Sequence, residues 1–134
     1  MRKRLLVGLL SAGLLAATLP GVVAADEAFV CEDGMLYEDM VLTVPVVVLE
    51  DTVCGFEDSV LKASVEVQDY GKLGFLSSSI KGNINVRDGA WAMLMGSSLN
   101  GNIECYPEEW PSGVALWAGN QLKGNISPKC YIEY

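Results

Sequence analysis

The sequence predicts an all-β protein folded as a parallel β-helix, a solenoid whose coils stack along one axis. Three observations predict this fold. The stretches IKGNI, LNGNI and LKGNI begin at Ile80, Leu99 and Leu122. Apolar residues recur in columns 19 residues apart over four consecutive periods, and a short fixed repeat is typical of solenoids. Within each period the apolar residues alternate, and Gly, Asn, Asp and Ser separate them, which predicts short strands joined by turns.

The first element along the chain is a predicted signal peptide, residues 1–25. Three basic residues precede an apolar run that extends to Leu19, and small residues follow at 22–25. This layout predicts cleavage after Ala24 or Ala25 and export to the cell exterior or cell wall. The alternative is an uncleaved anchor, although the run is shorter than the roughly 20 residues that span a bilayer.

Cleavage makes the protein strongly acidic. It removes three of the nine basic residues and none of the seventeen acidic ones, which leaves a net charge of −11. Such a chain lacks the positive surface that binds nucleic acid or anionic lipid, so neither is an expected partner. We expect the acidity to serve solubility.

The remaining chain, 26–134, is expected to form one domain. An N-terminal cap at 26–41 precedes four to five rungs at 42–127, and a tail follows at 128–134. The rungs take about 19 residues each, which fits a right-handed β-helix better than the hexapeptide steps of a left-handed one. Hairpins of an antiparallel β-sandwich are the alternative, but these would not keep one register over four periods.

Each rung carries a corner and an inward column. The glycine of GNI supplies a tight corner, and Asn83, Asn102 and Asn125 can stack as an amide ladder. The insert PEEWPSG lengthens one turn by four residues. After it, the inward columns are expected to resume at Ala115, Trp117, Leu122 and Ile126.

These motifs resemble a group of small exported right-handed β-helix proteins of Gram-positive bacteria. The resemblance rests on VVVLEDTVCGF (Val46 to Phe56), the GNI rungs, and GNIECYPEEWPSG with a final GNISPKC. Bactofilins, which are cytoplasmic and polymerise through β-helix ends, are a more distant likeness. The resemblance implies the fold and export, and brings no catalytic residues with it. The sequence departs from the group at Lys62–Val65, where KASV replaces GN, and in an apolar outward face.

Four cysteines, Cys31, Cys54, Cys105 and Cys130, all follow the predicted leader. An even number in an oxidising compartment predicts two disulfides, whereas zinc is disfavoured because CxxC pairs and histidine are absent from the sequence. The columns pair Cys31 with Cys54 and Cys105 with Cys130, so that each bond ties a cap over an open end. Buried free thiols are the alternative for the inward Cys54 and Cys105.

Three carboxylates, Glu50, Asp69 and Asp88, share one column. They could form a calcium ladder, but a calcium site needs more ligands than one column offers. The other interpretation is that acidic residues occupy turns and face water, as in Asp88-Gly89. We therefore expect no metal and no cofactor.

The candidate contact face is apolar. Trp91, Met93 and Met95 are expected to point outward, with Leu116 of the next rung beside them and Trp110 on the inserted loop. An exposed apolar patch usually marks a contact surface. Alternatively, the inserted loop or the C-terminal YIEY covers it.

Two classes of function follow. The first is a non-catalytic structural or interaction protein of the cell exterior, which uses the solenoid as a scaffold for a cell-surface protein or polysaccharide. The second is a carbohydrate- or small-ligand-binding module in which Trp91 and Trp110 stack on the ligand. An enzyme is not expected, because four rungs make a short groove and the chain lacks histidine for acid–base chemistry.

Overall fold

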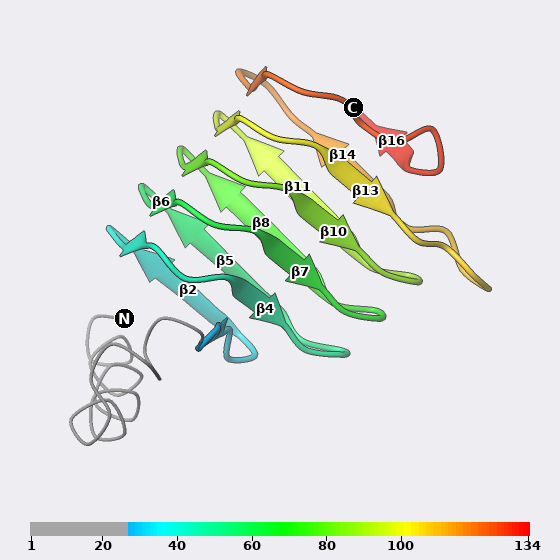
Figure 1. The fold of residues 1–134 in the computed structure, drawn as a ribbon, viewed down its shortest axis with the longest axis horizontal. Coiled ribbons are helices and arrows are strands. Elements are labelled where there is room, and N and C mark those ends of the chain that lie inside the picture. The colour runs from blue at the N-terminus through cyan, green and yellow to red at the C-terminus, as the bar shows by residue number, and fades with distance from the viewer. Residues whose placement is uncertain (1–26) are drawn as a thin grey trace.

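The computed structural model describes residues 27–134, so the predicted signal peptide lies outside the described residues. Sixteen short strands and no helix occur in this region. All the strand pairs formed there are parallel. The prediction of a parallel β-solenoid is therefore confirmed, and the antiparallel sandwich is excluded. Figure 1 shows the coils stacked along one axis, from β2 at one end to β16 at the other.

The strands form three sheets, which the chain visits in turn in each coil. Sheet A consists of β1 (Phe29–Val30), β4 (Val46–Val48), β7 (Val65–Val67), β10 (Ile84–Val86) and β13 (Ile103–Cys105). Sheet B consists of β2 (Met35–Glu38), β5 (Val53–Glu57), β8 (Lys72–Leu76), β11 (Trp91–Met95), β14 (Gly113–Leu116) and β16 (Tyr131–Glu133). Sheet C consists of β3 (Val41–Leu42), β6 (Val60–Leu61), β9 (Ser79–Ile80), β12 (Ser98–Leu99) and β15 (Gln121–Leu122).

Sheet B contains six strands, one per coil, so the described chain makes about six turns. The sequence predicted four to five, with a cap at 26–41 and a tail at 128–134. Both end segments instead continue the sheets: β1, β2 and β3 pair with the next coil, and β16 pairs with β14. These end segments were not recognised as coils because their sequences depart from the repeat. A terminal coil packs against one neighbouring coil only, so fewer of its positions are constrained.

The predicted columns fill the core. Leu61 pairs with Ile80, and Phe56 with Phe75, so that each residue meets its equivalent in the next repeat. Inward residues of the central coils are almost fully buried, and the rings of Phe56 and Phe75 stack with centroids 6.0 Å apart. Each coil thus buries its apolar side chains against those of the coils on either side.

Three corners separate the sheets. The B–C corner repeats one residue with positive φ in every coil, at Asp39, Asp58, Ser77, Gly96 and Gly119. At the C–A corner, which holds the GNI glycines, a Cβ on Gly82 would lie 2.5 Å from the carbonyl oxygen of Ala63. The corner glycine is therefore required by close approach of the preceding coil.

Two disulfides link neighbouring coils. Cys31 is bonded to Cys54, and Cys105 is bonded to Cys130. Both predicted pairings are confirmed, and the described chain has no free cysteine. Disulfides of this structural kind indicate an oxidising environment.

Candidate functional site

The outer face of sheet B carries three of the five residues predicted for the contact face. Trp91, Met93 and Met95 alternate on β11 with the buried Ala92 and Leu94. Trp91 and Met93 are half-buried, and Met95 is 38% exposed. These side chains lie on the solvent side of the solenoid wall.

Leu116 does not belong to this face. In β14, Val114 pairs with Ala92 and Leu116 pairs with Leu94, so both point inward. Val114 is fully buried, and Leu116 packs against the core. The prediction that Ala115 and Trp117 fill the inward column is wrong by one residue. Ala115 is buried, but it pairs with the outward Met93, and Trp117 is 48% exposed.

The register shift has a simple cause. The step from Trp91 to its partner Gly113 exceeds the regular repeat by three positions, whereas the step from Ser98 to its partner Gln121 exceeds it by four. Three of the four extra residues therefore precede β14 and the fourth follows it. Because side chains alternate along a strand, this division exchanges the two faces of β14.

The C-terminal strand covers one end of the face. Gly113 lies between Trp91 and Tyr131 in adjacent strands, and it lacks a side chain that would separate them. The Trp91 and Tyr131 rings meet edge to face, with centroids 5.8 Å apart. The tail therefore packs against Trp91, while Met95 and Trp117 stay exposed.

Trp110 lies on the inserted loop, which Asp88 holds in place. Oδ1 of Asp88 accepts hydrogen bonds from the backbone N–H groups of Glu108, Glu109 and Trp110, at 2.8, 3.0 and 2.9 Å. Hydrogen bonds from Trp110 and Glu108 lower the pKa of Asp88 below its ordinary value of 3.8. The Trp110 indole, 58% exposed, is thus presented by an anchored loop.

Tyr70 packs at the same corner. A Cβ on Gly89 would lie 2.6 Å from the Tyr70 ring, so the ring lies directly over this glycine. Desolvation, and then the negative charges of Asp88 and Glu109, raise the pKa of Tyr70. The Tyr70 phenol therefore ionises only at a more alkaline pH than an ordinary tyrosine.

The acidic column does not assemble a metal site. Asp88 is 8% exposed and its Oδ1 is occupied by the loop, whereas Glu50 is exposed. Across residues 27–134, no group of three Asp, Glu, Cys or His side chains is placed to hold a metal ion. The calcium alternative therefore has no ligand set in this region.

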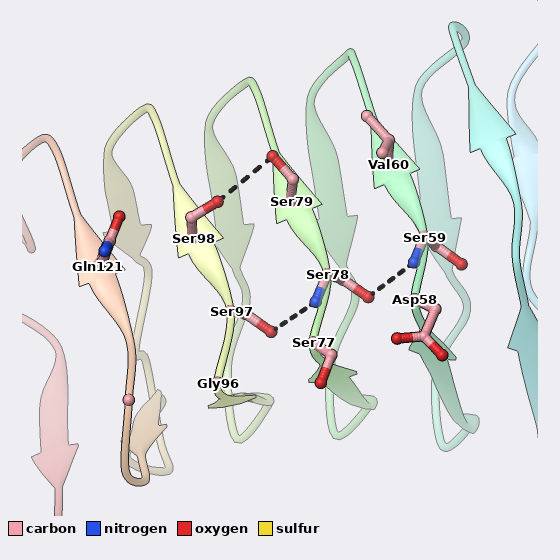
Figure 2. Close-up of a pocket in the computed structure, with 11 residues that line it drawn as sticks. Asp58, Ser59, Val60, Ser77, Ser78, Ser79, Gly96, Ser97, Ser98 and Gln121 are labelled. Carbon is pink, nitrogen blue, oxygen red and sulfur yellow. Dashed lines mark hydrogen bonds between the residues drawn. The ribbon is translucent and has the colours of Figure 1, made fainter.

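A polar groove at the B–C corner was not predicted from the sequence. Its volume is about 540 Å³, and Figure 2 shows its serine-rich wall. The groove is lined by Asp58, Ser59, Val60, Ser77, Ser78, Ser79, Gly96, Ser97, Ser98, Gly119 and Gln121. The regular spacing of Ser59, Ser78 and Ser97 was the sequence signal that could have revealed it.

A serine ladder forms the floor of this groove. Oγ of Ser78 accepts the backbone N–H of Ser59, and Oγ of Ser97 accepts that of Ser78, at 3.2 and 3.1 Å. The Ser59, Ser78 and Ser97 hydroxyls each donate to the carbonyl two residues earlier. Asn120 ends the ladder by accepting the N–H of Ser97 at 2.9 Å.

The outer groove residues are available to a ligand. Ser79 and Ser98 are half-buried and joined by a hydrogen bond of 3.3 Å, and Asp58 and Gln121 are exposed. Because the ladder hydroxyls donate to backbone carbonyls, none of them is paired with a base that would activate it as a nucleophile. The groove can offer hydrogen bonds to a polar ligand.

No family model matches the chain, and no curated protein or solved structure matches it either. None of the described residues belongs to a helix of the length and apolar character needed to cross a membrane.

Proposed function

We propose that the protein is an exported, non-catalytic interaction scaffold that binds a cell-surface protein through the outer face of sheet B. The observation that carries the proposal is the row of large apolar side chains, Trp91, Met93 and Met95, on the outer face of β11. None of the seventeen Asp and Glu residues lies in β8, β11 or β14. Sheet C also lacks carboxylates, but its outward positions in β9, β12 and β15 are serine and glutamine. The outer face of β11 is apolar instead, which usually marks a contact surface.

The contact strip consists of Trp91, Met93, Met95 and Trp117. Flexible methionines adapt to a partner surface, and methionine and aromatic residues are enriched in protein interfaces. Gly74 and Gly113 flank this strip in the adjacent strands and add no side chain to it. The resulting surface suits a flat partner better than a small ligand, which needs a concave site.

Export is supported by the two disulfides and by the signal-like N-terminal sequence. The predicted resemblance to small exported β-helix proteins of Gram-positive bacteria agrees with this location. The hydroxyl bonding in the serine groove supports a non-catalytic role, because it lacks an activated nucleophile.

The test compares two double variants in capture from cell-surface extract. Met93→Ser with Met95→Ser removes the centre of the strip. Val30→Ser with Val41→Ser, on the outer faces of sheets A and C, is the matched control away from both the strip and the serine groove. We expect the first pair to lose the partner that the wild type and the control capture. Both should unfold within about 1 kcal/mol of wild type. Equal capture by all three proteins would refute the role of the strip.

A polysaccharide ligand is the second candidate. The serine groove favours it, because Trp117 precedes the groove residue Gly119 by two positions and aromatic rings combine apolar contact with hydrogen bonding. Saturable binding of a cell-wall polysaccharide that is lost in Trp117→Ala, but kept in Trp110→Ala, would favour this function over the protein scaffold.

A further inference from the structure

The lysine edge, at the C–A corner, is a surface that the proposed function does not use. Lys62, Lys81 and Lys123 each follow a strand of sheet C directly, at the same position of three coils. Asn100 occupies this position in the coil between Lys81 and Lys123. All three lysines are exposed. In residues 27–134, no ion pair joins any of them to a carboxylate.

The corner itself contains no carboxylate. Positions 62–64, 81–83, 100–102 and 123–125 hold only Lys, Ala, Ser, Gly and Asn. Two acidic side chains lie on the adjoining face of sheet A, where Glu66 is paired with Arg87 at 3.3 Å and Glu104 is exposed. The other two corners carry acidic residues instead: Asp39 and Asp58 at the B–C corner, and Glu50, Asp51, Asp69 and Asp88 at the A–B corner.

The asparagines of the corner add donors to the lysines. Oδ1 of Asn83 accepts the backbone N–H of Asn102, and Oδ1 of Asn102 accepts that of Asn125, both at 2.9 Å. Because a backbone N–H can only donate, each amide must turn its oxygen to the neighbouring coil, which leaves its NH₂ group on the exposed side. The lysine edge therefore presents ammonium and amide donors to solvent, while the Oδ1 atoms of Asn83 and Asn102 are bonded to backbone N–H groups of the next coil.

We propose that this lysine edge binds a flexible phosphate polymer lying along the solenoid axis. Coils stack at about 4.8 Å, so the three lysines span roughly 14 Å. One phosphate could not contact both ends of this row, but an extended chain could. Lysine binds phosphate as a point charge, whereas bidentate recognition of carboxylates is the property of arginine.

Three other occupants fit less well. A second copy would have to place one convex corner against another, which buries little of the roughly 800 Å² per partner typical of a stable complex. Single-stranded nucleic acid needs aromatic platforms for its bases, and the corner has none. A membrane would bring the acidic sides of the molecule toward a surface of like charge.

The negative charge of the whole protein does not prevent this contact. From Asn83 to Asp88, five residues of extended chain separate the C–A corner from the acidic A–B corner, roughly 16 Å. The Debye length is about 8 Å at physiological ionic strength, so charges at that distance are largely screened. The exposed Glu104 lies closer, two residues past Asn102 and about 7 Å along the strand, in the coil that has Asn100 in place of lysine. Because Glu66 is offset by Arg87, three lysines act on the polymer along this row against one carboxylate within a Debye length.

The experiment titrates the disulfide-bonded protein with long-chain inorganic polyphosphate and follows its backbone amide signals by NMR. The shifts are expected to centre on 62–64, 81–83 and 123–125. Three lysines predict a slope of about −2 for the logarithm of affinity against that of salt, and thus roughly 15-fold weaker binding at 200 mM than at 50 mM. Lys62→Gln with Lys81→Gln should weaken binding at least tenfold at 50 mM salt.

The matched control is Lys72→Gln with Lys129→Gln, which removes the same charge away from the lysine edge and should leave binding within about twofold of wild type. Equal loss in both double variants would overturn the proposal, since bulk charge would then explain it. It is also overturned if polyphosphate does not bind at 50 mM salt. Binding of hyaluronan, single-stranded DNA or phosphatidylglycerol vesicles as tightly as polyphosphate would likewise overturn it.

Discussion

Gly101 stands where the backbone of the preceding coil leaves no room for a side chain. A Cβ built on it would overlap the carbonyl oxygen of Gly82, and one on Gly124 would overlap that of Gly101. The sequence predicted a glycine corner from the repeated GNI. It could not give the reason, because the approach of one coil to the next is a property of the stacked structure. The amide ladder also differs in detail, since the bonds join side-chain oxygens to backbone N–H groups.

Gly101→Ala should lower the free energy of unfolding by about 1–3 kcal/mol, the cost of forcing atoms into a filled space. Gly74→Ala is the matched control, because its Cβ would meet only the Cε of Met93 at 3.9 Å. That variant should unfold within about 0.5 kcal/mol of wild type. Denaturant unfolding measures both, and equal stability of the two variants would contradict the close-approach explanation.

Asp88 acts through its charge and its position under the inserted loop. The pKa of Asp88 is lowered in the folded protein. Its contribution to the free energy of unfolding is therefore complete above the ordinary pKa of 3.8, and it is lost as the pH falls through the lower, folded pKa. The amide signals of Glu108, Glu109 and Trp110 should therefore titrate together below pH 3.8 in NMR spectra.

Asp88→Ala should speed hydrogen exchange at these three amides at neutral pH, because their shared acceptor is gone. Asp69→Ala, in the same column of the preceding coil, should leave their exchange unchanged. Equal exchange in wild type and Asp88→Ala would show that the loop does not depend on this carboxylate.

Strand β14 is the strand whose register could not be predicted from the repeat. The columns of β5, β8 and β11 were predictable because each coil repeats the last at a constant spacing. The four-residue insert could be placed before β14, after it, or on both sides, and the sequence does not distinguish these positions. The division found in the structure puts Leu116 in the core and Trp117 at the surface, so one member of the predicted contact face was wrong.

The register of β14 can be tested by two substitutions with opposite expectations. Leu116→Ala should cost about 2 kcal/mol, toward the lower end for truncated core leucines because this side chain is only partly buried. Trp117→Ala should stay within about 0.5 kcal/mol of wild type. Thermal unfolding distinguishes the two registers. If Trp117 pointed inward, Trp117→Ala would lower the stability more than Leu116→Ala does.

The serine groove was missed for a related reason. Its column of Ser59, Ser78 and Ser97 is visible at the spacing of the repeat, but serine is expected in turns for its local hydrogen bonds. Only the stacked coils show that the hydroxyls also receive a bond from the neighbouring coil. Apolar columns were therefore more informative than polar ones, because burial constrains them in every coil.

The two ends of the solenoid differ from its middle in having a neighbouring coil on one side only. Stability in such a repeat is a sum of coil terms and nearest-neighbour contacts, so terminal coils are the first to open. Cys31 and Cys130 lie in the first and last coils, and each is bonded to the coil next to it. The disulfides thus tie the two terminal coils, the least stable parts of the solenoid, to their neighbours, as the sequence predicted for the two ends.

Removing one disulfide should therefore loosen one end and leave the other unchanged. Each bond closes a loop with a sequence separation of 23 or 25 residues, for which chain entropy predicts a contribution of about 3 kcal/mol. Cys31→Ser with Cys54→Ser should speed amide exchange in β1, β2 and β3. Cys105→Ser with Cys130→Ser should do so in β15 and β16, with β7 to β11 protected in both cases. Exchange that rises evenly over all coils in either variant would contradict this view, because the solenoid would then open as one cooperative unit rather than from its ends.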